Sequence, residues 1–329
     1  MEFGLQLANM EPARFRALSQ TAEGLGYDLI VFPDHIVMEG PERQYDPHTL
    51  AYDPMIIAAT VADATKKIKV GHLVLCNLFR HPVITAQSLV ALDHVSNGRM
   101  LAGLGTGWTE TEFQMTGIPF PPITERLRML DESLACITSL WANERTTFKG
   151  EFYQLNDAIL WPKPLQKPRP PIIIGGGGKG LLRIAAKYAD YVNLIPDSGK
   201  PGKVSLENIK KMTDESFRKK IEFVKEEAKR HGRDPNSIKF SNFIFNNVIT
   251  ESKEATRQMA EMMGAGFGLP SADAMLQSPM SLIGTPEECI VELKRRAKDW
   301  GVSQFVFATI MGIDEQQVRR LHEQILSHV

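Results

Sequence analysis

Four consecutive glycines, Gly175 to Gly178, follow a β-branched apolar run and precede a stretch with helical spacing. Glycine lets the backbone approach a ligand closely, and the N–H groups at the start of a helix attract phosphate. Residues 170–180 therefore predict a cradle for a phosphorylated ligand, with Lys179 near its end. A tight turn between a strand and a helix, without any ligand, is the alternative.

The spacing Gly175-x-Gly177-x-x-Gly180 also matches the fingerprint of dinucleotide-binding folds. A Walker loop is excluded, because Gly180 follows Lys179 where Ser or Thr is required. The place of these glycines among the strands decides whether the dinucleotide interpretation holds.

A second candidate for chemistry is the pair Asp34 and His35, which follows another apolar run. A carboxylate beside an imidazole can orient the ring, carry a proton, or shift the pKa of the histidine into the working range. The alternative is a turn aspartate next to an exposed histidine.

A third segment places glycine at alternate positions, Gly103, Gly105 and Gly107, with Thr106 and Trp108 beside the last of them. Alternate glycines remove side chains from one face of a strand, which leaves room for a flat ligand, and Thr106 adds a hydroxyl. A close contact with a neighbouring strand or helix explains the same spacing.

Other chemistries have little support in the sequence. The histidines are scattered, and the chain contains no His-x-x-x-His pair, no Cys-x-x-Cys pair and no Gly-x-Ser-x-Gly elbow. Neither a metal site nor a hydrolytic nucleophile is therefore expected. A phosphorylated, planar redox cofactor fits the cradle, the glycine-lined slot and the Asp-His pair together.

The elements that must position these motifs alternate regularly from residue 2 onward. Strands are expected at 2–8, 27–32, 68–76, 100–105, 172–174, 191–195, 238–248 and 304–309. Helical sequence follows each strand, and Thr285 with Glu288 predicts a capping box at one helix start. Eight such units favour an α/β fold, a single (β/α)8 TIM barrel over residues 1–329 with insertions such as a hairpin near 146–155.

In such a barrel the residues that follow the strands meet at one rim, so the three motifs are expected to lie together. The glycine fingerprint of a doubly wound sheet follows the first strand, whereas here it follows the fifth. This position argues against the dinucleotide interpretation.

Composition and charge limit the partners and the cellular compartment that are expected for this chain. The chain has 329 residues with a net charge of −1, which gives no electrostatic case for nucleic acid or an anionic membrane as a partner. Cys76, Cys136 and Cys289 are few, widely spaced and odd in number, so a reducing compartment is expected and a disulfide framework is not. The N-terminus has no secretory pattern and no apolar run reaches membrane-spanning length, which predicts a cytoplasmic protein.

Taken in order, the motifs resemble those of the bacterial luciferase-like monooxygenases, and within them the branch that uses the deazaflavin coenzyme F-420. The resemblance extends from about Glu2 to the C-terminus. It is carried by Val31–His35, Arg80–Pro82, Leu92–Arg99, Gly103–Trp108, Gly117–Phe120, Leu160–Pro164 and Pro171–Gly178. It implies a TIM barrel, a small-molecule substrate and a homodimer.

The resemblance also implies roles for individual residues. Asp34 and His35 resemble the pair that contacts the cofactor ring and the substrate, with His35 as proton carrier. Members of the family often have a non-proline cis peptide in the third strand, here expected near Leu73–Val74. The cofactor-binding residues that the resemblance implies are Leu73, Val74, Cys76, Thr106, Gly107, Gly175, Gly176, Gly177, Gly178, Lys179 and Asn193.

One position departs from a branch of the family. The sugar-phosphate dehydrogenases carry a catalytic acid directly after the Thr-Gly pair, whereas Trp108 stands there in this chain. The first acid after it is Glu110, which argues against that activity.

The expected function is hydride transfer between coenzyme F-420 and a small organic substrate, with His35 as acid or base. An FMN-dependent monooxygenase that uses a separate flavin reductase is the first alternative, because a flavin, unlike a deazaflavin, can form an oxygen adduct. A non-catalytic flavin-binding protein is the second.

Three further expectations concern single segments. Gly177→Asp is expected to abolish cofactor binding while the barrel stays folded.

Residues 264–279 are expected to form a lid over the substrate, or alternatively an insertion packed on the outside. Its apolar side chains Phe267, Leu269 and Met275 would close a pocket.

The third expectation concerns the lysine-rich stretch 200–233. It is expected to attract the negatively charged tail of coenzyme F-420, above all through Lys200 and Lys203. The alternative is an ordinary solvated helix face on which lysines alternate with glutamates.

Overall fold

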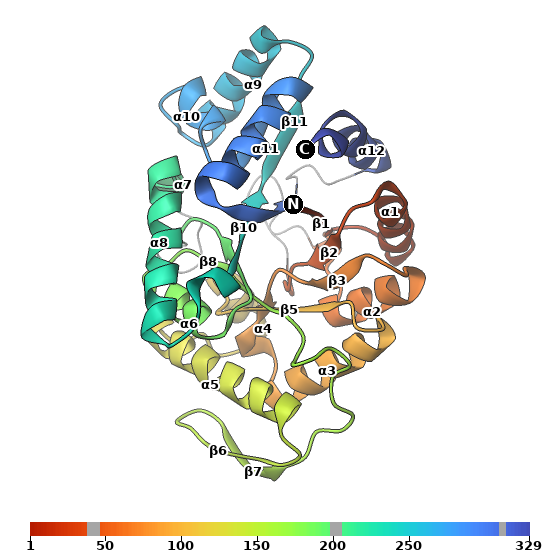
Figure 1. The fold of residues 1–329 in the computed structure, drawn as a ribbon, viewed down its shortest axis with the longest axis vertical. Coiled ribbons are helices and arrows are strands. Elements are labelled where there is room, and N and C mark those ends of the chain that lie inside the picture. Colours follow the sequence, from red (N-terminus) through yellow and green to blue (C-terminus); the bar gives the residue numbers. More distant parts are fainter. Residues whose placement is uncertain (38–46, 198–205, 309–313) are drawn as a thin grey trace.

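The structure is a computed structural model that describes residues 1–37, 47–197, 206–308 and 314–329. Within these residues, eight parallel strands close into a barrel with helices around it (Figure 1), which confirms the predicted fold. The barrel strands, in the order in which they pair, are β1 (Glu2–Gln6), β2 (Leu29–Phe32), β3 (Lys69–His72), β5 (Met100–Gly105), β8 (Ile172–Gly176), β9 (Tyr191–Leu194), β10 (Lys239–Ile244) and β13 (Val302–Phe307).

The closure of the barrel excludes a doubly wound sheet. Strand β13 pairs with β1, with Phe3 opposite Phe305, and β3 pairs with β5, with Val70 opposite Met100. The glycine run lies at the end of β8, the fifth barrel strand, so the dinucleotide interpretation of its spacing is wrong.

A helix follows each barrel strand and covers its outer side. These helices are α1 (Pro12–Leu25), α2 (Pro54–Ala64), α3 (Pro82–Val95), α5 (Ile123–Ala142), α6 (Lys179–Tyr188), α8 (Asp214–Arg230), α11 (Pro286–Trp300) and α12 (Glu315–Gln324). The predicted capping box is present in α11, where the Thr285 N–H donates to Glu288 at 3.0 Å and the Glu288 N–H donates back to Thr285.

Further elements lie in the connections. They are the helices α4 (Glu110–Thr116), α7 (Leu206–Lys210), α9 (Lys253–Gly266) and α10 (Ala272–Leu276), and the 3-10 turns Asn77–Phe79, Pro235–Ser237 and Leu326–His328. The predicted hairpin is formed by β6 (Thr146–Lys149) and β7 (Gln154–Ala158), which pair antiparallel.

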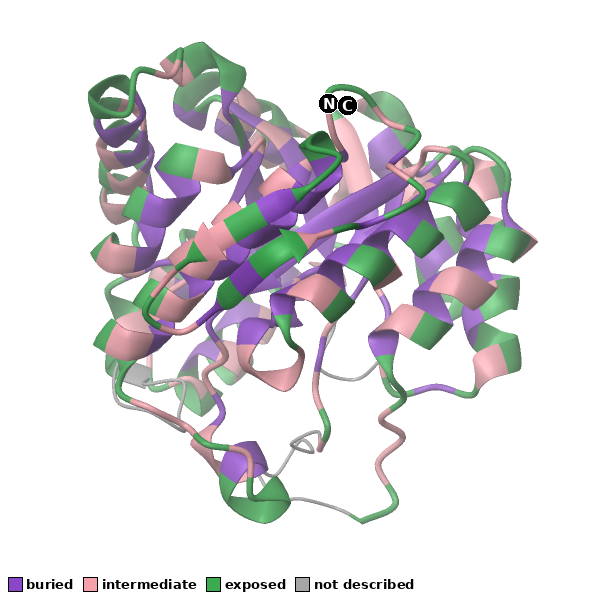
Figure 2. Ribbon diagram, turned by 90° about the horizontal axis from the view of Figure 1, so that it is seen from below, coloured by how far each residue is buried: buried purple, intermediate pink, exposed green. Residues whose placement is uncertain are grey.

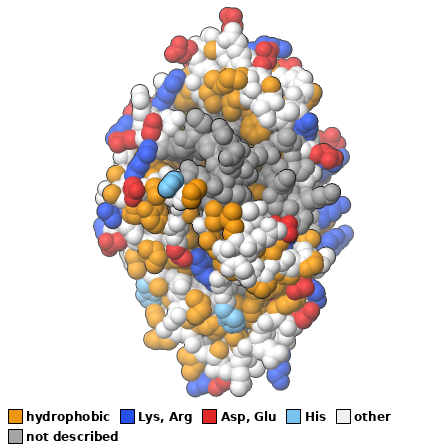
Figure 3. Space-filling model, turned by 180° about the vertical axis from the view of Figure 1, so that it is seen from behind, with side chains coloured by type: hydrophobic (Ala, Val, Ile, Leu, Met, Phe, Trp, Pro, Cys, Tyr) orange, Lys and Arg blue, Asp and Glu red, His pale blue; other side chains and the backbone are white. Residues whose placement is uncertain are grey.

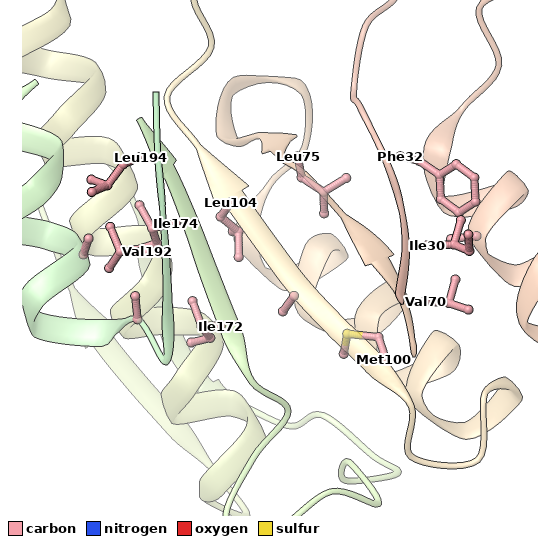
Figure 4. Close-up of a cluster of buried hydrophobic side chains, with 14 of the residues drawn as sticks. Ile30, Phe32, Val70, Leu75, Met100, Leu104, Ile172, Ile174, Val192 and Leu194 are labelled. Carbon is pink, nitrogen blue, oxygen red and sulfur yellow. The ribbon is translucent and has the colours of Figure 1, made fainter. Parts of the chain in front are cut away.

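The core has two layers because successive strand residues point to opposite sides. Side chains such as Val31, Ile173 and Val306 fill the interior of the barrel. Their neighbours along the strands, such as Phe32 and Ile174, pack outward against the helices (Figure 4). Figure 2 shows the result, with buried residues along the strands and the inner sides of the helices and exposed residues on the outer sides.

Two expected strands are interrupted. The strand expected at 68–76 breaks after β3 and resumes as β4 (Leu75–Cys76), and the peptide bond between Leu73 and Val74 is cis, as the resemblance implied. The strand expected at 238–248 ends at Ile244, and β11 (Asn246–Ile249) leaves the barrel.

Strand β11 belongs to an insertion of which the sequence indicated only the segment 264–279. It pairs in parallel with β12 (Ser281–Gly284), and both pack with α9 and α10 at the upper end of the molecule in Figure 1. Ala260, Met275 and Ile283 form a small hydrophobic core of their own there. This insertion rises beside the carboxyl ends of the strands, so it can contribute a wall to a site at the rim.

Candidate active site

A cavity of about 630 Å³ lies at the rim where the barrel strands end. Its walls come from the segments that follow several strands, as the barrel fold requires for a site at this end. The lining includes every residue that the sequence analysis proposed for the site: Asp34, His35, Leu73, Val74, Cys76, Thr106, Gly107, Gly175, Gly176, Gly177, Gly178, Lys179 and Asn193.

His35 is held by a buried acid, Glu112. The His35 Nδ1 lies 3.1 Å from Glu112 Oε2, and the glutamate side chain is only 3% exposed. The Trp108 ring meets the imidazole edge to face, with the ring centroids 5.9 Å apart. Because Glu112 occupies the Nδ1 side, proton exchange with a ligand in the cavity falls to Nε2.

Glu112 is itself fixed by the backbone that carries His35. Its Oε1 accepts the N–H groups of Ile36 at 2.8 Å and of Val37 at 3.2 Å. It also lies in the first turn of α4, where the helix dipole favours a carboxylate. Three donors on one carboxylate make the position of His35 relative to α4 well defined.

Glu110 is the first acid after Trp108 in the sequence, but it is Glu112 that contacts His35. The helix α4 has seven residues, too few for a clear apolar period. The spacing Thr109-x-x-Glu112 is that of a capping box and could have indicated a helix start. In the structure, however, Glu112 turns to His35 instead of capping the helix.

Asp34 is buried and engaged on both oxygens. It accepts the Cys76 N–H at 2.9 Å and the Arg80 guanidinium at 2.6 and 3.3 Å. Burial raises the pKa of the Asp34 carboxyl, and the contacts with Arg80 and the Cys76 N–H oppose that rise. Asp34 therefore ties the end of β2 to β4, directly after the cis peptide.

Arg80, the first residue of the Arg80–Pro82 motif, is engaged by two carboxylates. Its guanidinium bridges Asp34 and Asp53, with 2.8 Å to the Asp53 Oδ2. Asp53 in turn caps α2 through the Met55 N–H at 2.8 Å. The pKa of Arg80 is raised because these two carboxylates outweigh its burial.

The alternate glycines of β5 make room for the chain itself. A Cβ at Gly105 would lie 2.6 Å from Val74 Cγ2, and one at Gly103 would overlap the carbonyl oxygen of His72. Val74 also lies against Gly175 of β8, 3.2 Å from where a Cβ would stand. The close-contact explanation of the spacing is therefore confirmed, and Leu73–Val74 itself forms part of the cavity wall.

The turn after β5 is braced from behind by Arg126 of α5. Its guanidinium donates to the carbonyl oxygens of Gly107 and Thr106, and the Phe120 ring lies 3.9 Å away. Burial lowers the pKa of Arg126. Sequence reasoning missed this residue, because nothing near it in the sequence points to the turn.

The glycine cradle is packed on most sides. A Cβ at Gly176 would overlap Leu181, and one at Gly177 would overlap the Ile195 carbonyl oxygen. A side chain at Gly177 would therefore disturb the fold, so the expectation that Gly177→Asp leaves the barrel intact is wrong. Gly178 has more space, since a Cβ there would lie 3.5 Å from the Asp197 carboxylate.

Part of the lysine-rich stretch reaches this cradle. Lys220 of α8 donates from Nζ to the carbonyl oxygen of Gly177, and burial lowers the pKa of its ammonium group. Lys200 and Lys203, on which the sequence analysis relied, lie outside the described residues. Lys219 instead pairs with Glu215 four residues earlier, as on a solvated helix face.

The segment 264–279 covers one side of the cavity. Phe267, Leu269 and Met275 all line it, as predicted. The segment is partly helical, because α9 runs through Gly266 and α10 follows after a short turn. That this segment opens and closes stays a prediction.

Neither a metal site nor a membrane span is found in the part of the chain that the structure describes. No helix there is long and apolar enough to cross a bilayer. No group of three or more His, Cys, Asp or Glu side chains there could hold a metal ion.

Comparison with known proteins gives the family. A model of luciferase-like monooxygenases matches residues 2–304. An F-420-dependent glucose-6-phosphate dehydrogenase of Microbacterium testaceum is 28% identical over 315 residues, 93% of this chain and 90% of its own length. The same enzyme of Amycolatopsis mediterranei is 33% identical over 180 residues, about half of the length of each protein.

A relative with another cofactor is also similar. The FMNH(2)-dependent dimethylsulfone monooxygenase of Pseudomonas putida is 29% identical over 177 residues, 54% of this chain and 47% of its own length. Among solved structures, an F-420-dependent secondary alcohol dehydrogenase has a TM-score of 0.79 at 20% identity, covering 100% of this chain and 99% of that one. This likeness shows the fold, and the match over residues 2–304 shows that the chain belongs to the luciferase-like monooxygenase family.

Proposed function

We propose that this protein is an oxidoreductase that uses coenzyme F-420 to transfer hydride to or from a small organic substrate. The observation that carries the proposal is the His35–Glu112 pair, which borders the same cavity as the glycine cradle. Several similar proteins are F-420-dependent enzymes, which supports the choice of cofactor.

The residues present fit a phosphorylated planar cofactor. The cavity volume of about 630 Å³ lies within the range of small-molecule sites. Gly178, Lys179 and Lys220 would hold the phosphate end, where the absent side chain of Gly178 leaves space. Val74, Thr106 and Gly107 would contact the ring. When bound, a deazaflavin supplies a ring carbon that donates or accepts hydride.

His35 then carries the proton that accompanies hydride transfer. Glu112 accepts from Nδ1–H, which selects the tautomer with Nε2 free to accept a proton, and it stabilises the imidazolium that results. Asp34 is a positioning residue, because both of its oxygens are occupied by Arg80 and the Cys76 N–H.

An FMN-dependent monooxygenase with a separate flavin reductase is the second candidate. The similarity to the Pseudomonas putida enzyme supports it. A non-catalytic flavin-binding protein has less support, because burying the Glu112 carboxylate against His35 costs free energy that mere binding does not require.

The proposal also includes an oligomeric state and a cellular compartment. The resemblance of the motifs to the family supports a homodimer, which size-exclusion chromatography with light scattering would detect. The three cysteines are buried and unpaired, which is compatible with the reducing conditions of the cytoplasm.

Parallel titration of the purified protein with coenzyme F-420 and with FMN tests the cofactor. The proposal expects the fluorescence of the deazaflavin to report tight, saturable binding, and FMN to bind at least tenfold more weakly. Tight binding of FMN without binding of coenzyme F-420 would contradict the proposed cofactor and favour the FMN-dependent monooxygenase.

A further inference from the structure

We propose that the substrate is an uncharged, largely hydrophobic alcohol or carbonyl compound, and that a sugar phosphate is excluded. This inference rests on the proposed function, since it concerns the molecule that is presented to His35. It is carried by the composition of the cavity wall that the insertion contributes.

This wall, called here the hydrophobic wall, consists of side chains from two places in the chain. The end of β10 and the segment before β12 supply Phe243, Phe245 and Met280, and the α9–α10 region supplies Phe267, Leu269 and Met275. The rings of Phe243 and Phe245 lie 6.0 Å apart. Such a surface stabilises a ligand mainly by burying its apolar area. Asn246, Ser278 and Ser281 line the cavity beside it and add a small number of polar groups.

The hydrophobic wall is firmly supported from behind. Met275 packs in the small core of the insertion and is 1% exposed. Arg296 of α11, fully buried, donates to the carbonyl oxygens of Pro279 at 3.0 Å and Ser281 at 2.6 Å. These bonds fix the backbone on both sides of Met280.

The buried cation behind this wall is not available to a phosphate. Besides the two carbonyl groups, Arg296 binds Glu292 at 2.7 Å and Asn242 at 3.1 Å. Its guanidinium therefore has no exposed surface with which to bind a ligand in the cavity.

The charged groups that line the cavity also disfavour an anionic substrate. Among the described lining residues, the only Lys or Arg is Lys179, at the start of α6 in the cradle proposed for the cofactor. Outside that cradle, the described lining therefore presents no Lys or Arg with which a substrate phosphate could pair, and Glu112 is engaged by His35 and the backbone N–H groups of Ile36 and Val37.

Next to His35 the surface is again aromatic, because the Trp108 ring contacts the imidazole. The outer face of the molecule agrees with this picture. In Figure 3 hydrophobic side chains gather below the tip formed by α9 and α10, while charged side chains lie mostly along the outline. The Trp108 ring therefore extends the apolar lining of the cavity to His35.

Calorimetric titration of the cofactor-loaded protein with three probes tests the inference. The probes are 2-butanol, 2-octanol and glucose 6-phosphate. We expect the affinity to rise by about fourfold for each added methylene between the two alcohols, the value for burying one CH₂ group, and no binding of glucose 6-phosphate. Binding of glucose 6-phosphate, or affinity independent of chain length, would overturn the inference.

Two variants and a matched control locate the binding surface. Phe267→Ser and Phe245→Ser should each weaken 2-octanol binding at least tenfold without changing the affinity for the cofactor. Met262→Ser changes a side chain of the same insertion that is 64% exposed and does not line the cavity, so it should change neither affinity. Equal 2-octanol affinity in wild type and in both Phe variants, with folding verified by circular dichroism, would contradict the proposal.

The test separates this inference from the proposed function. If the protein binds FMN and not coenzyme F-420, the proposed function fails. The same titrations with FMN-loaded protein then still decide the substrate class, because chain-length dependence reports on the hydrophobic wall and not on the cofactor.

Discussion

At the scale of single residues, the proposed function depends most on the contact between His35 and Glu112. Replacing Glu112 by Gln removes the charge that stabilises a protonated His35 and retains the side-chain shape. We expect turnover to fall by about 10²-fold or more, the usual range for losing acid–base assistance, with cofactor affinity unchanged.

Steady-state rates and cofactor titration on the same preparation measure both effects. Glu110→Gln, two residues away in the same helical turn, is the control and should keep wild-type turnover. Glu112→Asp should recover part of the rate. Loss of cofactor affinity in step with turnover would indicate a structural role for Glu112.

A second residue-scale prediction concerns stability in acid. His72 is fully buried, and among the described residues its ring nitrogens have only the nearby Pro54 backbone, which lies outside good hydrogen-bond geometry. Burial lowers the pKa of His72 to about 3, against 6.5 for the ordinary side chain. The neutral ring therefore stabilises the fold fully above pH 6.5, and this stability is lost as the pH falls toward 3.

The expected slope is about 1.4 kcal/mol per pH unit within that window. Urea unfolding at pH 7.5, 5.5 and 4.5 measures it. His72→Leu cannot be protonated, so the gap in unfolding free energy between wild type and variant should narrow or reverse as the pH falls. A gap that stays constant over this range would show that His72 does not contribute to acid sensitivity.

Some site residues were predictable and others were not, for a physical reason. Asp34, His35 and the cradle glycines lie in short sequence motifs at strand ends, so local pattern and the barrel fold together place them at the rim. Glu112 and Lys220 act through contacts across 77 and 43 positions of the chain. Such contacts leave no local pattern, because the partners are brought together only by the folded barrel.

At the scale of elements, the strand–turn–helix unit of β8 and α6 makes the cradle. Gly178 has a φ of −76°, which other residues adopt easily, and space for a Cβ. Gly178→Ala should therefore keep cofactor affinity within about threefold. Gly178→Asp adds a carboxylate at the helix N-terminus close to Asp197, where it would repel a ligand phosphate.

We expect Gly178→Asp to weaken F-420 binding at least tenfold, as measured by fluorescence titration, with a melting temperature close to that of Gly178→Ala. If the two variants bind the cofactor equally well, the phosphate is held elsewhere.

Helix α8 contributes to the same cradle through Lys220. Lys220→Met removes a positive charge next to Gly177 and should weaken F-420 binding by about tenfold at low salt. Because ions screen charges over about 10 Å at 0.1 M salt, the loss should shrink as salt is added. Lys219→Met changes an exposed neighbour that pairs with Glu215 and should have no effect. Equal losses of F-420 affinity in Lys220→Met and Lys219→Met would contradict a role for Lys220 in the cradle.

At the scale of the whole molecule, the barrel was predictable because the alternation of strand and helix repeats along the chain. The pairing of β11 with β12 in the insertion was not. Strands β11 and β12 have four residues each, which is too short to show a period of two. They pair with each other, although α9 and α10 lie between them in the sequence. The hydrophobic wall therefore became visible only in the structure, although Phe267, Leu269 and Met275 were expected to close an apolar pocket.

The arrangement of the whole molecule brings the three parts of the site together. The glycine cradle lies after β8, His35 lies after β2, and the hydrophobic wall comes largely from the insertion that follows β10. The central claim is that hydride moves between a cofactor and a substrate in this cavity while His35 carries the proton.

The most direct test is a single-turnover measurement with oxidised coenzyme F-420 bound and 2-octanol deuterated at its carbinol carbon. The account predicts that deuterium is transferred to the cofactor in the wild-type protein, with a rate that falls at least 10²-fold in His35→Asn while cofactor affinity in the same samples is unchanged. Transfer at the wild-type rate in His35→Asn, or none in wild-type protein shown to bind both molecules, would contradict it.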